Sequence, residues 1–199
     1  MGRVDPLPPA DWPPTMQDAL AALRPANPRH AFPPRDPSRP KGLNVLGLLA
    51  HHPELTTAYH TLVGHILYAT TLTAPQRELL VLRVAHLRDA EYEWAQHVVL
   101  ARDAGLTDEE IERVRAGSGA DGWSPLQAAL LDAADELVRD ARVSPDTWST
   151  LRDALDTQQL LDVVFTVGTY DTLAMAFRTF ELELDDDLVV AAGRKRPSP

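Results

Sequence analysis

The chain contains no cysteine among its 199 residues. Disulfide bonds, thiolate nucleophiles, and metal or redox sites built on cysteine are therefore excluded. Positive charge is also scarce, because 19 Lys and Arg residues stand against 29 Asp and Glu residues, a net charge of −10. A protein that binds nucleic acid without sequence preference needs a basic surface. We therefore expect no nucleic-acid partner.

Long apolar runs are missing too, and the first residues do not lead us to expect a leader segment. No stretch approaches the roughly 20 apolar residues that span a bilayer. The first residues lack a basic flank followed by an apolar core, so no secretory signal is expected. These absences predict no membrane partner and a cytoplasmic location. No segment alternates apolar and polar residues between hairpin turns, so we expect no β-sheet.

Proline divides the chain, because most of the 17 prolines lie in the first 53 residues. Such a segment has room for one short helix, around Thr15 to Arg24, followed by an extended arm. Two interpretations of the arm stay open: a mobile tail, or an arm that wraps a neighbouring subunit. We predict a Pro-rich arm at 1–42, a helical domain at 43–184 and a charged, frayed tail at 185–199.

Helix signals run through residues 43–184 almost without a break, which predicts an all-α fold. The helix from Pro75 to Arg88 is apolar nearly all round and should be central. The next helix should begin near Ala90, with Asp89 as its cap. A last, long helix is apolar on most sides, so we expect it to be buried in the domain or in an oligomer interface. Other start signals carry a capping side chain: Thr73, Thr107, Ser124, Ser144 and Asp156.

Ionisable groups fall on helix faces that should be apolar. Glu93 and His97 lie one turn apart on the helix that begins near Ala90, and Glu78 lies in line with apolar positions of the preceding helix. Moving a carboxylate or an imidazole from water into an apolar interior costs on the order of several kcal/mol. The cost is smaller only where the group is paired or lies in a polar pocket. Three such groups on one helical hairpin indicate a functional cleft.

Three segments carry a family resemblance: Arg77–Ala85, Glu91–His97 (Glu-Tyr-Glu-Trp-Ala-Gln-His) and Ala104–Ile111. Together they resemble the carboxymuconolactone decarboxylase family, which also contains the alkylhydroperoxidase D-like proteins. The resemblance extends from about Leu43 to Leu184. It implies a helical domain of the alkylhydroperoxidase D-like type, assembly as a homo-oligomer (trimer or hexamer), and a site near the hairpin.

The peroxidase branch of that family uses a Glu, a Cys-x-x-Cys pair and a His that relays protons. Carried over by spacing, the Glu falls on Glu78 and the His on His97, while the two Cys positions fall on Ala90 and Glu93. Neither Ala nor Glu forms a thiolate, so peroxidase activity is not expected. The decarboxylase branch works without cysteine or cofactor and resembles this chain better.

By that resemblance the chain is a cofactor-free lyase or isomerase that acts on a small acidic or enolisable molecule by acid–base catalysis. Decarboxylation, dehydration, isomerisation and cyclisation would all use such groups. His97 would be the general acid/base, Glu93 its partner or a second acid/base, and Glu78 would orient His97 or raise its basicity. The expected substrate-binding residues are Trp94, Tyr92, Arg83, Tyr170 and Asp171.

Other interpretations remain open at this point. Glu93 and His97 fit a structural pair at the edge of the core, Trp94 fits a core residue, and Asp171 fits a partner for an Arg of a neighbouring subunit. We expect no metal site, because the hairpin has neither the His spacing of a zinc-binding helix nor the Glu-x-x-His spacing of di-iron bundles. The alternative function is a non-catalytic oligomeric scaffold or binding protein.

Overall fold

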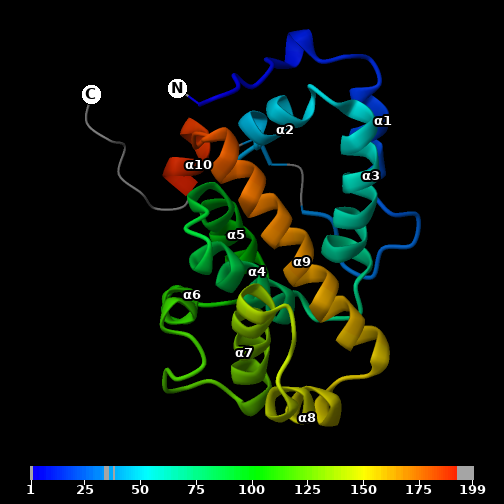
Figure 1. Cartoon of the computed structure of the whole chain (residues 1–199). Helices are drawn as coiled ribbons and strands as arrows, with labels where there is room; N and C mark the ends of the chain where they lie inside the picture. The colour runs from blue at the N-terminus through cyan, green and yellow to red at the C-terminus, as the bar shows by residue number, and fades with distance from the viewer. Residues whose placement is uncertain (1, 34–35, 38, 192–199) are drawn as a thin grey trace. The chain divides into compact units, whose positions relative to one another are not determined.

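The protein is described from a computed structural model that covers residues 2–33, 36–37 and 39–191 (Figure 1). All regular structure in these residues is helical, which confirms the all-α prediction. The longer helices are α1 (Met16–Ala22), α2 (Leu43–Leu49), α3 (Pro53–Gly64), α4 (Ala74–Leu87), α5 (Glu91–Asp103), α6 (Asp108–Arg113), α7 (Pro125–Asp140), α8 (Pro145–Ala154), α9 (Thr157–Phe180) and α10 (Asp186–Ala191). Short turns are η1 (Pro9–Asp11), the π-helical η2 (His65–Ala69) and η3 (Val114–Ala116).

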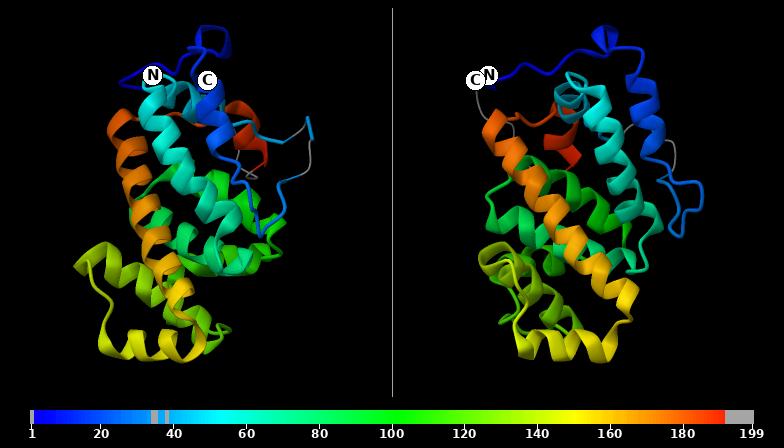
Figure 2. Two further views of the ribbon diagram at one scale, coloured as in Figure 1. Left: turned by 90° about the vertical axis from the view of Figure 1, so that its right-hand side faces the viewer. Right: turned by 45° about the vertical axis from the view of Figure 1, so that its right-hand side comes forward.

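The described residues form two compact units, one from those within 2–69 together with 177–191, the other from residues 70–176. In the first unit α1 lies beside α3, as both views of Figure 2 show. The buried ring of His60 on α3 meets the carbonyl of Ala19 on α1 at 2.8 Å, and the N–H of Leu7 donates to the carbonyl of Gly47. The proline-rich segment therefore packs on helices of its own chain, an arrangement that neither interpretation of the arm foresaw.

The predicted charged tail contains a helix that the sequence did not indicate. α10 begins beside Asp185, whose carboxylate accepts the N–H of Asn44 at 2.9 Å. Leu188 on α10 is fully buried, so tertiary contacts hold a segment that we expected to fray. Residues 192–199 of the predicted tail lie outside the described residues.

In the second unit α4 packs against both α5 and α7, and α8 lies across the end of α7 (Figure 2). The buried core between them contains Leu79, Leu82, Trp94, Val98, Leu131 and Ala174. Several helices of this unit start at the predicted capping residues, as at Thr73, Thr107 and Ser124, and each of these three forms a capping box. Each box satisfies N–H groups that a helix leaves without an internal partner, so these boundaries are set locally.

α9 is long and apolar enough to cross a membrane by length and composition, with 44% of its most apolar window buried. The sequence analysis predicted that this helix is apolar on most sides, but it did not predict a membrane-spanning length. Two of its acidic side chains bond within the second unit: Asp162 accepts from Thr70 and Thr71, and Asp171 pairs with Arg88. These contacts are those of a helix packed in its own domain.

Candidate active site

The α4–α5 hairpin is closed by a short turn that determines where its charged side chains lie. Asp89 adopts a left-handed conformation (φ 49°), and its N–H points to the carbonyl of His86. The N–H of Ala90 donates to the carbonyl of Ala85 at 2.9 Å. This is the Schellman arrangement at a helix end. Ala90, not Asp89, is then the N-cap of α5, and no side chain caps it, so the predicted Asp89 cap is wrong.

Glu93 occupies the third position of α5, where a capping-box Glu reaches back to the N–H of the N-cap residue. That N–H belongs to Ala90 and is already bonded to Ala85. The Glu93 side chain is 1% exposed, and neither of its carboxyl oxygens has a hydrogen-bond partner among the described residues. The turn thus leaves a buried carboxyl group without the contact that its position would ordinarily supply.

Glu78 on α4 lies in the opposite situation. It is fully buried, and each of its carboxylate oxygens has its own partner. Oε1 accepts from Nε of Arg77 at 2.8 Å, and Oε2 lies 2.7 Å from Nδ1 of His97 on α5. Arg77 and His97 are themselves nearly buried. The result is a row of three ionisable side chains, Arg77–Glu78–His97, inside the second unit.

The two carboxyl groups have opposite acidities. Burial by itself raises the pKa of Glu78, but attraction to His97 and Arg77 and the hydrogen bonds from both outweigh it, so the pKa lies below its ordinary value. For Glu93, burial and then the negative charge of Asp171 hold the pKa well above the usual range. Glu78 is therefore held as a carboxylate, whereas Glu93 favours the neutral acid.

The ionised Glu78 also fixes the proton arrangement of His97. A carboxylate only accepts hydrogen bonds, so Nδ1 of His97 carries the hydrogen of this contact, and in the neutral ring Nε2 keeps its lone pair. The ring of Tyr170 on α9 meets the His97 ring edge-on, with centroids 4.8 Å apart. His97 thus has one nitrogen bound to Glu78 and one that is able to accept a proton.

Two of the expected substrate-binding residues are already engaged in ion pairs. Arg83 pairs with Asp135 (2.8 Å between Nη2 and Oδ2) and donates to the carbonyls of Val114 and Arg115. Arg83 is thus already bonded within its own chain, and its role as the cation that holds a substrate carboxylate stays a prediction. Asp171 pairs with Arg88 of its own chain and acts on Glu93 through its charge.

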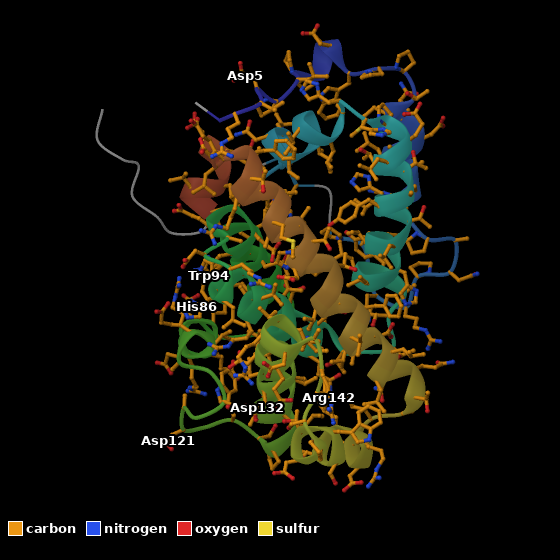
Figure 3. All side chains as sticks on the ribbon, viewed as in Figure 1. Asp5, His86, Trp94, Asp121, Asp132 and Arg142 are labelled. Carbon is orange, nitrogen blue, oxygen red and sulfur yellow. The ribbon has the colours of Figure 1, made fainter. Side chains whose placement is uncertain are left out.

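Trp94 and Tyr92 are buried, 5% and 2% exposed. Trp94 belongs to the core and lies beside His86 (Figure 3), while the guanidinium of Arg115 covers its ring at 3.8 Å. The enclosed Trp94 ring packs in the core, and a contact between Trp94 and a substrate stays a prediction. Of the predicted site residues, the structure brings Glu78, His97 and Tyr170 into contact. Glu93 bonds to none of them, although the enzyme hypothesis expected it within hydrogen-bond reach.

Sequence reasoning missed Arg77, which we had named only as part of the family motif. Neighbouring residues of a helix ordinarily point in different directions, so Arg77 and Glu78 gave no pairing signal. The available signal was an arginine inside a helix that is apolar nearly all round. Among the residues that the structure describes, no group of three His, Asp or Glu side chains is placed to hold a metal ion.

Comparisons with known proteins agree with this architecture. Residues 53–136 match the carboxymuconolactone decarboxylase family. The uncharacterized protein YdfG of Bacillus subtilis is 25% identical over 101 residues, which is 50% of this chain and 69% of that protein.

Two solved structures share the fold at low sequence identity. The alkylhydroperoxidase AhpD core protein of Ralstonia eutropha has a TM-score of 0.66 at 20% identity and covers 76% of this chain and 82% of its own. The debrominase Bmp8, bound to 2,3,4-tribromopyrrole, has a TM-score of 0.69 at 13% identity over 96% of this chain and 95% of its own. Residues 53–136 are thus similar to the carboxymuconolactone decarboxylase family, and the described residues share the fold of the alkylhydroperoxidase D-like structures.

Proposed function

We propose that this protein is a cofactor-free acid–base catalyst that moves a proton on a small enolisable organic molecule. The observation that carries the proposal is the buried Glu78–His97 hydrogen bond of 2.7 Å, on a hairpin that also holds a second buried carboxyl group, Glu93, which favours its neutral form. A pair of titratable groups whose surroundings push their acidities apart is the usual basis of acid–base catalysis.

In this proposal Nε2 of His97 accepts a proton from the carbon next to a carbonyl group, which leaves an enolate. Glu78 stabilises the imidazolium that forms, because the carboxylate lies against Nδ1. The neutral carboxyl group of Glu93 then supplies a proton to the enolate oxygen or carbon. If the substrate carries a carboxylate β to the carbonyl, loss of CO₂ leaves the same enolate, so decarboxylation needs no additional group.

The absence of cysteine removes the thiol route for this chain. Bmp8 is a debrominase whose structure holds a small bromopyrrole ring. That complex supports a small ring-shaped substrate for the fold, while the chemistry here has to come from imidazole and carboxyl groups. Peroxide consumption with a dithiol as donor should stay at the buffer background, and catalysed turnover would contradict this point.

The decisive experiment follows substrates by NMR in D₂O. A panel of carboxylated lactones, β-keto acids and their neutral esters reports both CO₂ loss and exchange of the proton next to the carbonyl. We expect at least one compound to react, and His97→Ala to lower the rate by about 10²–10⁴-fold. His65→Gln, at an exposed position, is the matched control and should retain the rate. An unchanged rate in His97→Ala would remove His97 from the mechanism.

The alternative, a non-catalytic scaffold, predicts no exchange with any compound. Against it stands the cost of Glu93: a buried carboxyl group without a partner destabilises a fold by about 1–3 kcal/mol. A protein under selection only for its shape would replace such a group with an apolar residue.

We further propose that the protein assembles with copies of itself in the cytoplasm, as the resemblance implies. An exposed apolar stripe along α9 supports this: Leu161, Phe165 and Met175 are each more than half exposed, and Val164 is 42% exposed. The stripe carries no charge, so a second copy of this acidic chain meets no repulsion there. Phe165→Asp should lower the mass measured by light scattering, whereas Gln158→Asp should not. A monomeric wild type would contradict the proposal.

A further inference from the structure

We propose that Arg77 is a positioning residue of the candidate active site: its charge offsets that of ionised Glu78 and thereby keeps Nε2 of His97 free of a proton and ready to act as a base. The proposal deepens the proposed function, but the proton arrangement it describes exists without any substrate. Arg77 itself is not placed in contact with a reacting molecule.

The geometry assigns one partner to each oxygen of Glu78. Nε of Arg77 donates to Oε1 at 2.8 Å, and the Nδ1 hydrogen of His97 is directed to Oε2 at 2.7 Å. The exposed fractions of the three side chains are 8% for Arg77, 0% for Glu78 and 7% for His97. Water therefore does little to screen the three groups from one another, and the charge of Arg77 acts on the Glu78–His97 pair through the shared carboxylate.

The balance of charge gives the direction of the effect. With Arg77 present, ionised Glu78 and neutral His97 leave the row without net charge. If Arg77 becomes neutral, the same state has an uncompensated buried negative charge. Such a charge attracts a proton, so the Glu78–His97 pair would hold one more proton up to a higher pH. A protonated pair cannot serve as a base. Arg77 thus counteracts the proton affinity that a lone carboxylate would induce in His97.

The other charged groups near His97 do not supply this compensation. On α5, Glu93 favours its neutral form. From α9 the ring of Tyr170 meets His97, and the negative charge of Asp171 lies beside its partner Arg88. Among the bonds that the structure shows for Glu78 on α4, its titratable or charged partners are Arg77 and His97. Arg77 is therefore the cation whose removal should change the pair.

The test titrates the His97 ring by NMR in ¹⁵N-histidine-labelled full-length protein, with His97→Gln used to assign its signals. Arg77→Met should raise the midpoint at which the Glu78–His97 pair takes up its proton, observed at the His97 ring, by about one pH unit or more, because a positive charge that disfavours the protonated pair is lost. Arg77→Lys keeps the charge and should titrate within about half a unit of wild type. Circular dichroism checks that each variant is folded.

An unchanged midpoint in Arg77→Met overturns the proposal, and so does an equal rise in Arg77→Lys, because charge would then not be the cause. If Arg77→Met does not fold, Arg77→Gln, which keeps a donor but no charge, provides the same comparison. If both neutral variants unfold, Arg77 serves folding and the proposal is again overturned.

The titration needs no substrate, so its outcome is independent of the substrate screen. A raised midpoint together with a failed screen would support the role of Arg77 and count against acid–base catalysis. Once a substrate is found, the acidic limb of the pH–rate profile should move to higher pH in Arg77→Met, by the same amount as the His97 midpoint.

Discussion

Glu78 and Glu93 are two buried carboxyl groups on the two helices of one hairpin, yet their surroundings are opposite. Both oxygens of Glu78 are bonded to cationic or titratable side chains on α4 and α5. Both oxygens of Glu93 lack a hydrogen-bond partner among the described residues, and the charge that acts on its pKa is the negative one of Asp171. Equal burial thus leads to opposite pKa shifts, because the partners of a buried group decide which protonation state it can keep.

The largest expected effect comes from removing Glu78. Glu78→Leu leaves Arg77 as a buried charge without its carboxylate, so the free energy of unfolding should fall by about 3–5 kcal/mol. The double variant Arg77→Met with Glu78→Leu should recover most of that loss, because replacing a whole buried ion pair by apolar residues is often close to neutral. Urea denaturation of the single and double variants measures both. A double variant as unstable as Glu78→Leu would contradict the pairing.

The opposite change in the free energy of unfolding is expected for Glu93, on the second helix of the hairpin. Glu93→Leu removes a buried carboxyl group that has no partner, and should raise the free energy of unfolding by about 1–3 kcal/mol. Glu91→Leu, at an exposed position of the same helix, is the control and should change stability by less than about 0.5 kcal/mol. Destabilisation by Glu93→Leu would mean that Glu93 has a bonded partner in solution, and the comparison would fail.

The pH dependence of stability separates the two groups further. Glu93 has a raised pKa in the folded state, so it keeps its proton while the unfolded chain releases it. Its contribution therefore makes stability fall as pH rises from about 4.3 toward that raised value, by at most about 1.4 kcal/mol per pH unit. Glu78 has a lowered pKa, so its stabilisation is present above about pH 4.3 and is lost as pH falls through the folded-state value.

Urea denaturation at a series of pH values tests these signs. Glu93→Gln should flatten the decline of stability on the alkaline side, and Glu78→Gln should flatten the decline on the acidic side. If Glu93→Gln shows the same alkaline decline as wild type, another group causes it.

The smallest effect concerns the influence of Asp171 on Glu93. Asp171→Asn removes one negative charge and leaves Arg88 without its carboxylate, and both changes favour ionised Glu93. Burial is the larger cause of the raised pKa, so the Glu93 midpoint should fall by less than about one unit. A ¹³C NMR titration of the Glu side-chain carboxyl carbons measures it. Asp153→Asn, at an exposed position, should leave the midpoint in place, and a rise in Asp171→Asn would reverse the assigned electrostatics.

Local chemistry explains which features of the fold were predictable. The capping boxes at Thr73 and Thr107 and the cap at Ser144 are confirmed, because each joins atoms within one helical turn. The cap at Asp89 was wrong, because the same residue also ends α4. Its left-handed conformation belongs to the Schellman turn, which makes Ala90 the N-cap.

The candidate site was predictable only as a set of residue types. The spacing of Glu93 and His97 indicated a pair one turn apart, whereas the contact of His97 with Glu78, 19 residues away in sequence, was expected only from the family resemblance. Likewise, the partner of Arg83 is Asp135, 52 residues away, and so Arg83 is already paired with a carboxylate of its own chain. Both partner choices depend on how α4, α5 and α7 pack together.

The amino-acid sequence by itself determined the helical class, most helix starts, the exclusion of thiol chemistry and the presence of buried ionisable groups on one hairpin. Those properties follow from composition and from contacts within a few residues. The tertiary structure alone decided which carboxyl group is ionised and which is neutral. Acidity in a protein interior depends on burial and on the charges within a few ångströms, and here the bonds to Glu78 and their absence at Glu93 are set by helix packing.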